Sequence, residues 1–167
     1  MLTNLKFKKY YYQEREFIRS TIYWMVRSDI TDDLVQETFI KAWNNFDNFN
    51  KKSSFRTWIY RIAMNTTYDY LRKKKIDSSI GDKQISADYQ DPKNSEQKMI
   101  MKDLIDFAMG ELDENSKEVF ILFYKMEYTI SDIAKLLGIP EGTVKSRLHS
   151  SKEKFQRILE KHGVTNE

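Results

Sequence analysis

The sequence predicts an all-α fold: two small helical domains joined by a flexible acidic linker, the C-terminal domain containing a helix-turn-helix. Of its 167 residues, 40% are hydrophobic and 32% charged, whereas only 5 are Gly and 2 are Pro. This composition favours helices over turn-rich β folds. Residues 76–95 combine Gly, Pro, Ser and Asp without apolar periodicity. We therefore expect a linker there, between domains at 1–75 and 96–167.

Apolar residues at helical spacing predict the individual helices. In the N-terminal domain they indicate helices over 10–25, over 34–43, and from Ser53 or Ser54 to Arg72, with Thr31 and Asp32 as a start signal for the second. In the C-terminal domain the same spacing predicts helices over 96–109, 116–126, 131–137 and 141–161.

The charges divide along the chain in a similar way. Residues 1–75 carry 15 Lys and Arg against 8 Asp and Glu, residues 76–118 carry 5 against 11, and residues 119–167 carry 8 against 6. Two basic parts therefore flank an acidic one. Such blocks are typical either of partner binding or of an ordinary solvated surface.

Several classes of protein are disfavoured by composition. The chain has no Cys, and His149 and His162 are far from any obvious carboxylate pair. Zinc-ligand and thiol-nucleophile spacings are absent, so we expect no catalytic residue, metal, cofactor or small-molecule substrate. The N-terminus lacks the apolar run of a signal peptide, and no segment has the roughly 18 apolar residues of a membrane span. We expect a cytoplasmic protein.

Two of the C-terminal helices are predicted to follow each other closely. Thr129 can cap the first of them, with Asp132 three residues on, and Gly138 suits the left-handed position that ends it. Pro140 is placed where a helix can begin, because proline lacks an amide hydrogen and the first amide of a helix has no partner within the helix. This spacing is the helix-turn-helix pattern.

The second helix of the pair has one apolar and one polar side. At about 100° per residue, the inward stripe contains Val144, Leu148, Phe155, Ile158 and Leu159. Short polar side chains lie opposite, between two edges of Lys and Arg, which suits base edges and phosphates of a DNA duplex. The candidate duplex contacts are Thr143, Lys145, Ser146, Arg147, His149, Ser150 and Lys152. A solvated amphipathic helix remains the alternative.

The helix that follows Ser54 carries a different polar face. Arg61, Asn65, Tyr68 and Arg72 recur at helical spacing with Trp58 beside them, opposite a stripe that includes Phe55. Rings can stack on unpaired bases while arginines follow the phosphates, so this face suits single-stranded DNA. Trp58 and Tyr68 could instead be core residues.

The preceding helix exposes an apolar patch among polar groups. Asp33, Gln36, Ile40 and Trp43 fall beside or opposite the stripe of Leu34, Thr38 and Ala42. Such a patch suggests a protein partner. For Trp43, a place in the core is equally consistent with the pattern.

Both domains resemble one family. IAKLLGIPEGTVKSRLHSSKEKF is similar to the promoter-reading helix-turn-helix of extracytoplasmic-function sigma factors, although Ser150 and Ser151 stand where many relatives have Arg or Ala. DDLVQETFIKAWNNFDNF and SSFRTWIYRIAMNTTYDYLRKKK resemble the other domain of that family, in the family's order. The resemblance covers residues 10–75 and 96–160 and implies an RNA polymerase sigma factor.

The resemblance also implies roles for the residues named above. The duplex contacts would read the −35 promoter element. Phe55, Trp58, Arg61, Asn65, Tyr68 and Arg72 would read the −10 element, with a flipped base held by the loop over 48–55. Asp33, Gln36, Glu37 and Ile40 would dock on the clamp helices of the largest subunit of core RNA polymerase, and the C-terminal domain on its flap region. An anti-sigma factor is a further expected partner.

The acidic linker has two interpretations. By analogy with the family, Asp77, Asp82, Asp88 and Asp91 would occupy basic nucleic-acid channels of the polymerase as a displaceable substitute for phosphates. Alternatively, the linker is a solubilising tether.

Two other functions are weighed against the sigma factor. A one-component regulator that binds duplex operators explains the helix-turn-helix but leaves the polar face of 58–72 without a task. A nuclease could hold magnesium through Asp32, Asp33 and Glu37, although three carboxylates on one helix are more often surface charges.

Overall fold

The computed structural model describes residues 2–78 and 96–164. Within these ranges every regular element is helical, which confirms the all-α prediction, and the chain divides into two compact units, Met1–Asp88 and Tyr89–Glu167. Asp82, Asp88 and Asp91 of the predicted linker lie outside the described residues. In the described ranges no helix combines the length and the apolar character that crossing a membrane requires.

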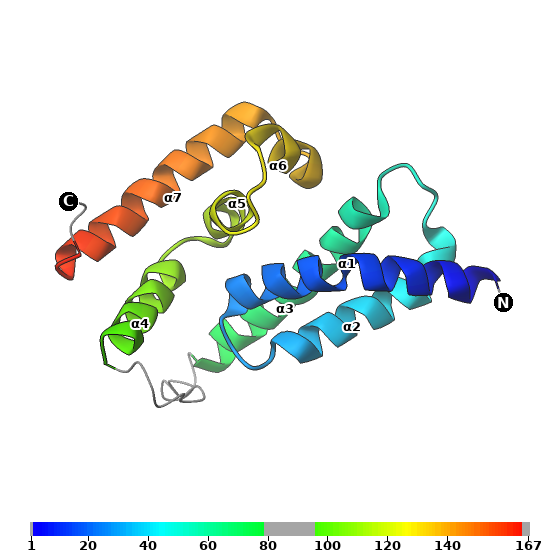
Figure 1. The fold of residues 1–167 in the computed structure, drawn as a ribbon, viewed down its shortest axis with the longest axis horizontal. Coiled ribbons are helices and arrows are strands. Elements are labelled where there is room, and N and C mark those ends of the chain that lie inside the picture. Colours follow the sequence, from blue (N-terminus) through cyan, green and yellow to red (C-terminus); the bar gives the residue numbers. More distant parts are fainter. Residues whose placement is uncertain (1, 79–95, 165–167) are drawn as a thin grey trace. The chain divides into compact units, whose positions relative to one another are not determined.

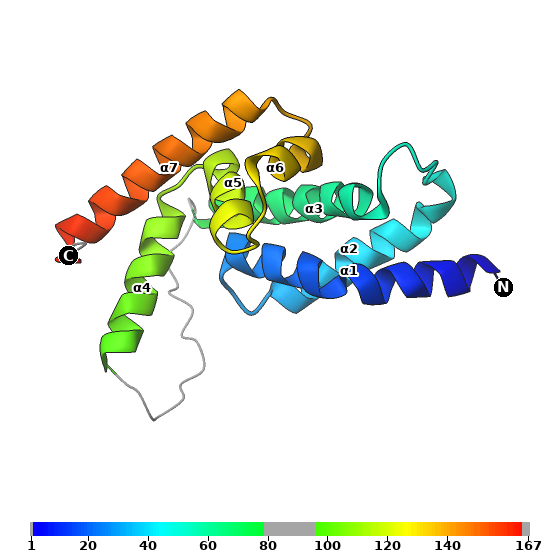
Figure 2. The same ribbon diagram turned by 45° about the horizontal axis from the view of Figure 1, so that its top comes forward.

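Three long helices form the N-terminal unit: α1 (Leu2–Val26), α2 (Thr31–Asn44) and α3 (Phe55–Ser78), with a short 3-10 helix, η1 (Phe46–Asn48), after α2. The three helices lie side by side, as Figure 1 and Figure 2 both show. Side chains from all three are at most 1% exposed in the shared core: Ile18, Ile22, Met25, Ala42, Ile59, Tyr60 and Ala63. Removing this apolar surface from water is the main force that holds the helices together.

The ends of these helices depart from the predicted ones in instructive ways. α1 starts at Leu2 rather than near residue 10, and Arg27, at φ 49°, ends it in the left-handed region. Thr31 stands at the start of α2, but its hydroxyl does not cap the helix: it donates to Ser28 O at 2.7 Å. Ser54 does cap α3, because its Oγ accepts from Thr57 N at 3.1 Å. α3 continues past Arg72 to Ser78, and so includes Asp77.

Four helices form the C-terminal unit: α4 (Glu96–Gly110), α5 (Glu114–Tyr124), α6 (Ile130–Leu137) and α7 (Glu141–Lys161). α4, α5 and α6 all contact α7 (Figure 1). The fully buried core of this unit comprises Ala108, Val119, Ile121, Leu122, Ile133 and Val144. α5 begins earlier than predicted because Asp113 caps it: Asp113 Oδ1 accepts from Ser116 N at 2.9 Å.

Candidate nucleic-acid and partner interfaces

The turn between α6 and α7 forms as its residues predict. Thr129 Oγ1 accepts from Asp132 N at 3.1 Å and donates to Asp132 Oδ2 at 2.6 Å, which fixes the start of α6. Gly138 ends that helix at φ 67° and ψ 36°, a conformation that costs a residue with a Cβ more than it costs glycine. Pro140 is the residue before α7 rather than its first residue. The second helix therefore starts within one tight turn of the first.

The outer face of α7 is accessible. Val144 and Leu148 are 0% and 8% exposed and anchor the inner side, while Phe155, Ile158 and Leu159 are only half-buried. Of the predicted duplex contacts, five are exposed and two, Thr143 and Arg147, are half-buried. The exposed five are Lys145, Ser146, His149, Ser150 and Lys152.

The burial of Ser151 in α7 was not predicted, whereas Glu153 lies on the polar side of the helix, as its spacing predicts. Ser151 is 1% exposed and its hydroxyl donates to Leu148 O at 3.0 Å, so this serine faces the core, unlike its neighbour Ser150. An acidic residue, Glu153, stands on the outer face: its carboxylate oxygens lie 3.6 Å from His149 Nε2 and 3.8 Å from an Arg157 nitrogen. Such pairs at i, i+4 stabilise a helix by only about 0.2–0.5 kcal/mol, so these side chains can rearrange to meet a ligand.

The outer face of α3 displays most of the residues predicted to contact unpaired DNA. Arg61, Asn65 and Arg72 are exposed, and Trp58 and Tyr68 are half-buried. Arg72 also pairs with Asp69, one turn back, at 3.3 Å. The face therefore presents cations, an amide and parts of two rings.

Phe55 does not belong to that face. It is 5% exposed and stacks on Tyr10 of α1 with a centroid distance of 4.3 Å and an interplanar angle of 6°. Further rings surround it, at centroid distances of 6.1 Å for Phe46, 5.6 Å for Phe49 and 5.5 Å for Trp58. The prediction that Phe55 contacts DNA directly is therefore wrong. Phe55 instead packs against Phe49, in the loop between η1 and α3, and against Trp58, and so supports both from the core side.

A pocket of about 530 Å³, the α2–α3 pocket, lies beside this face. Its lining residues come from α2 and the residue that follows it, from η1 and from α3: Lys41, Asn45, Asn48, Trp58, Ile62, Asn65 and Thr66. Trp58 supplies an aromatic wall, while the lysine and the asparagines supply hydrogen-bonding groups. Pockets of this size hold small ligands, and this combination of groups suits a nucleobase.

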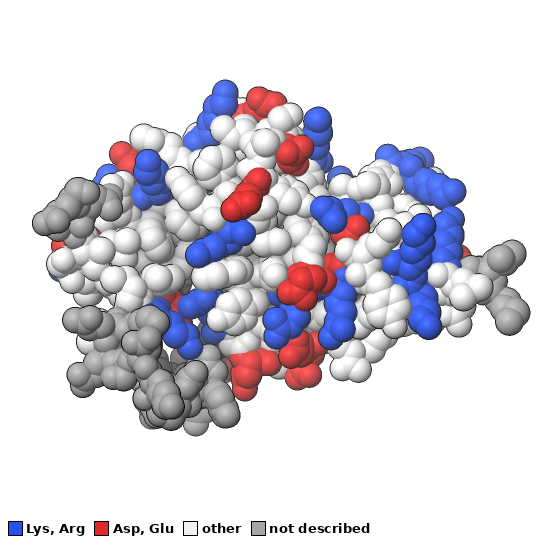
Figure 3. Space-filling view, viewed as in Figure 1, with Lys and Arg blue, Asp and Glu red and all other residues white. Residues whose placement is uncertain are grey.

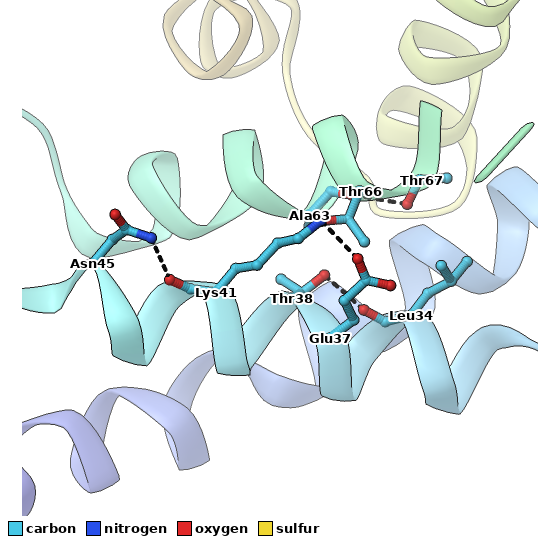
Figure 4. A network of polar contacts seen from close by, with 8 residues as sticks. All are labelled: Leu34, Glu37, Thr38, Lys41, Asn45, Ala63, Thr66 and Thr67. Atoms are coloured by element: carbon cyan, nitrogen blue, oxygen red, sulfur yellow. Dashed lines mark hydrogen bonds and ion pairs between the residues drawn. The ribbon is translucent and has the colours of Figure 1, made fainter. Parts of the chain in front are cut away.

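Lys41 is held at the wall of the α2–α3 pocket by a polar network (Figure 4). Its Nζ lies 2.7 Å from Glu37 Oε1 and donates to Thr66 Oγ1 at 3.1 Å. Asn45 Nδ2 donates to the backbone oxygen of Lys41 at 2.8 Å. Glu37 is thus turned toward α3 and helps to orient Lys41, a relation that the helical pattern of α2 alone did not reveal.

A larger groove of about 860 Å³, the α1–α2 groove, runs along the other side of α2. Of the predicted polymerase contacts, Gln36 and Ile40 line it, whereas Asp33 is exposed outside it. Ile40 is 52% and Trp43 is 44% exposed, with the Trp43 ring 5.1 Å from Phe7. The remaining lining residues are Tyr11, Arg15, Arg19, Asp32, Val35 and Phe39. Its partly apolar surface suits a protein partner.

The carboxylates proposed for a nuclease do not share a site. Asp32 Oδ1 accepts from Arg19 Nε at 2.9 Å, and this hydrogen bond, followed by the charge of Asp32, raises the pKa of Arg19. Glu37 pairs with Lys41 on the side of α2 that faces α3. Because Asp32 and Glu37 are directed to different cations, the arrangement does not assemble a metal centre from Asp32, Asp33 and Glu37.

Comparison with known proteins defines the class. Residues 11–76 match Sigma-70 region 2, and residues 102–155 match Sigma-70, region 4. The first range contains α2, η1, most of α3, the whole lining of the α2–α3 pocket and all of the α1–α2 groove lining except Phe7. The second contains α6 and most of α7, the two helices of the helix-turn-helix. The chain therefore combines two regions of a sigma-70-type transcription factor.

Individual relatives indicate a group within this class. The chain is 34% identical over 139 residues to the ECF RNA polymerase sigma factor SigW of Bacillus subtilis, covering 77% of this chain and 74% of SigW. It is 30% identical over 148 residues to the ECF RNA polymerase sigma-E factor of Haemophilus influenzae, covering 82% and 78%. The structure also resembles the sigma factor RpoE of Bartonella quintana, solved in complex with the anti-sigma factor NepR. That match has a TM-score of 0.70 and 25% identity, over 93% of this chain and 97% of RpoE.

The chain belongs to the extracytoplasmic-function (ECF) group of the sigma-70 family. It is an RNA polymerase sigma factor, a protein that joins core polymerase and directs initiation at promoters. The one-component regulator is not favoured, because it would not require the region 2 match over residues 11–76.

Proposed function

We propose a division of labour among the surfaces of this sigma factor, with α7 reading the −35 element as duplex DNA. The residues for this role are Thr143, Lys145, Ser146, Arg147, His149, Ser150 and Lys152. The exposure of the lysines supports phosphate contacts, and that of Ser146, His149 and Ser150 supports contacts with base edges. Ser151 has no direct part in this role because it is buried.

The outer face of α3 and the α2–α3 pocket receive the −10 element. Trp58, Arg61, Asn65, Tyr68 and Arg72 contact the DNA, and one unpaired base enters the pocket beside Trp58. Flipping a base costs a few kcal/mol, so a pocket that holds it favours the melted state. The single observation that best supports this role is the meeting of an aromatic wall with Lys41, Asn45, Asn48 and Asn65 in one pocket.

The α1–α2 groove is the proposed docking site for the clamp helices of the largest polymerase subunit. Gln36 and Ile40 contact that partner directly, with Asp33 at the edge of the contact. Glu37, because it is bound to Lys41, links the docking helix to the DNA pocket. The flap region of the polymerase binds the C-terminal unit.

An anti-sigma factor is the proposed regulator. Support comes from the resemblance to RpoE, which was solved with the anti-sigma factor NepR. We further propose that the chain performs no covalent chemistry and acts in the cytoplasm, where core polymerase and promoters are found.

Run-off transcription tests the function directly. Core polymerase from the source organism is mixed with the full chain and a library of genomic fragments, and start sites are mapped. We expect initiation at a set of sites that share −10 and −35 elements. An absence of initiation at any site, or no co-migration with core polymerase, would contradict the assignment.

A further inference from the structure

The end of the N-terminal unit where α1 begins is strongly basic. Residues 2–13 contain three Lys and no Asp or Glu, and residues 48–68 contain two Lys, two Arg and again no acid. The first acidic side chain along α1, that of Glu14, is 11% exposed and bound to Arg56. Figure 3 shows Lys and Arg side chains gathering over this end of the unit.

Aromatic contacts bring these two acid-free segments together. Tyr10 of α1 stacks on Phe55 at 4.3 Å and meets Phe49 at 6.3 Å, while Phe7 lies 6.2 Å from Phe55. The loop between η1 and α3 is therefore fastened to the first turns of α1. Two acidic residues adjoin these segments: Asp47 of η1, and Glu14, which is paired with Arg56. The Lys and Arg side chains outnumber them, and like charges that converge repel one another, so this end favours a polyanionic partner.

Helical geometry decides which lysines belong to this surface. Lys6 precedes Tyr10 by four residues and so lies on the side of α1 that faces the loop, and Lys9 follows Lys6 by three. Lys51 and Lys52 lie in the loop, where Asn50 Oδ1 accepts from Lys52 N at 3.2 Å. All four lysines are exposed. We call Lys6, Lys9, Lys51 and Lys52 the basic end.

The basic end continues the proposed single-strand site. Asn48 lines the α2–α3 pocket and precedes Lys51 by only three residues. The Phe49 ring, next along the chain, lies 5.1 Å from Trp58 on one side and 6.3 Å from Tyr10 on the other. A strand that leaves the pocket past Trp58 therefore has a path of rings and lysines toward α1.

We propose that the basic end binds phosphates of the unpaired strand between the −10 element and the start site. This rests on the proposed role of the α2–α3 pocket and extends it, since the strand is gripped over further nucleotides after the flipped base. Lysines act as point charges on phosphates, so this interaction has no sequence preference. It lengthens the melted segment that the protein can hold.

The test uses polymerase holoenzyme containing the full chain. The probes are two labelled non-template strands of a promoter mapped by run-off transcription: a short one that ends after the −10 element, and a long one that ends at the start site. The variant combines Lys6→Gln, Lys9→Gln, Lys51→Asn and Lys52→Gln. Asn is chosen at position 51 because Lys51 has φ 59°, which Asn tolerates better than most residues.

We expect the wild type to bind the long strand more tightly than the short one, and the variant to bind the two strands equally. Binding of the short strand should not change. On the long strand, the slope of log affinity against log salt should fall by about 0.7 for each phosphate that the variant no longer neutralises. Lys8→Gln is the matched control: two positions from Lys6, it points about 160° away from Lys6 around α1 and should leave both affinities unchanged.

Three results would overturn the inference: an unchanged preference of the variant for the long strand, an equal weakening on both strands, or an equal effect of Lys8→Gln. Binding of the free chain to phosphatidylglycerol vesicles that the variant alone abolishes would also overturn it, in favour of a lipid surface. Arg61→Gln separates this inference from the proposed function, because it should lower the affinity of the holoenzyme for the short strand and for the long strand alike. If Arg61→Gln changes neither affinity, the proposed role of α3 at the −10 element fails, rather than the role of the basic end.

Discussion

Arg56 donates from Nε to Glu14 Oε2 at 2.7 Å and so ties the first turn of α3 to the middle of α1. The Glu14 side chain is 11% exposed, and the Arg56 guanidinium also lies over the Phe17 ring at 4.9 Å. Hydrogen bonds to charged groups are worth more than neutral ones. We expect Glu14→Gln to lower the free energy of unfolding of the N-terminal unit by about 1–2 kcal/mol.

Urea unfolding followed by tryptophan fluorescence measures this loss, because Trp24, Trp43 and Trp58 all lie in the N-terminal unit. Glu16→Gln is the control: Glu16 is exposed and points to another side of α1. It should change stability by no more than about 0.5 kcal/mol. Equal losses in the two variants would contradict a specific role for the Glu14–Arg56 pair.

Asp113 makes the stability of the C-terminal unit depend on pH. Partial burial alone would raise the pKa of its carboxyl, but hydrogen bonds from Ser116 and from nearby backbone amides outweigh it, so the pKa lies below the usual 3.8. A lowered pKa in the folded state means that the cap stabilises the fold above pH 3.8 and is lost as the pH falls through the folded value. Asp113→Ala should therefore cost about 0.5–2 kcal/mol near neutral pH.

Circular dichroism during urea unfolding at pH 7, 5 and 3 checks this. The deficit of the Ala variant should be constant between pH 7 and pH 5 and smaller at pH 3. Asp113→Asn keeps a capping oxygen without a titrating proton, so it should be nearly as stable as the wild type at pH 7. A deficit for Asp113→Ala that is the same at all three pH values would sink the prediction.

Trp58 is expected to hold the melted −10 strand by stacking. Stacking of a base on an aromatic ring is worth about 1–3 kcal/mol, so Trp58→Ala should weaken holoenzyme binding to the non-template strand by about 5- to 150-fold. Trp58→Tyr, which keeps a ring, should recover much of that loss. Affinity for core polymerase should be the same in both variants. A Tyr variant as weak as the Ala variant would argue against stacking.

Lys145 and Lys152 of α7 are exposed and predicted to contact phosphates of duplex DNA. Each change to Gln should weaken binding to all sequences alike and reduce the salt slope by about 0.9. Ser146→Ala, in contrast, should change the base preference and leave the slope alone. Fluorescence anisotropy with −35 duplexes at several salt concentrations measures both effects. Unchanged slopes in the two Lys variants would remove these residues from the interface.

Ile40 tests the docking role of the α1–α2 groove. Ile40→Asp places a charge in the apolar part of the groove, and we expect at least a tenfold loss of affinity for core polymerase, about 1.4 kcal/mol. Ile76→Asp is the matched control: Ile76 is 57% exposed, compared with 52% for Ile40, but lies near the end of α3. Co-migration titrations of both variants decide the matter. Equal losses would show that the effect is not specific to the groove.

Local chemistry made part of the fold predictable. The α6–α7 turn follows from Thr129, Asp132 and Gly138, because a cap and a left-handed residue need only neighbours in sequence. The same rule, applied to Asp113, would have found the true start of α5. The early start of α1 could not be found this way, since Phe7 and Tyr10 are held by rings of η1 and the following loop.

The candidate sites also divide into features set by residues close in sequence and features set by packing between distant residues. Helical spacing placed Arg61, Asn65 and Ile40 on exposed faces correctly. Helical spacing could not show which neighbouring helix a charged side chain would contact. It therefore missed the network of Glu37 and Lys41, in which Lys41 donates to Thr66, 25 residues away. Phe55 was assigned both to the buried stripe and to DNA, and only the packing of rings around it resolves the choice.

The loop between η1 and α3 is already fixed by rings from α1 and α3 in the free protein. An element that is ordered in advance loses little conformational freedom when its ligand arrives. The proposed capture of a base would then require no folding step of its own, and its speed would follow the spontaneous fluctuations by which the promoter exposes a base. In that proposal the factor retains openings that thermal motion has made, rather than forcing the strands apart.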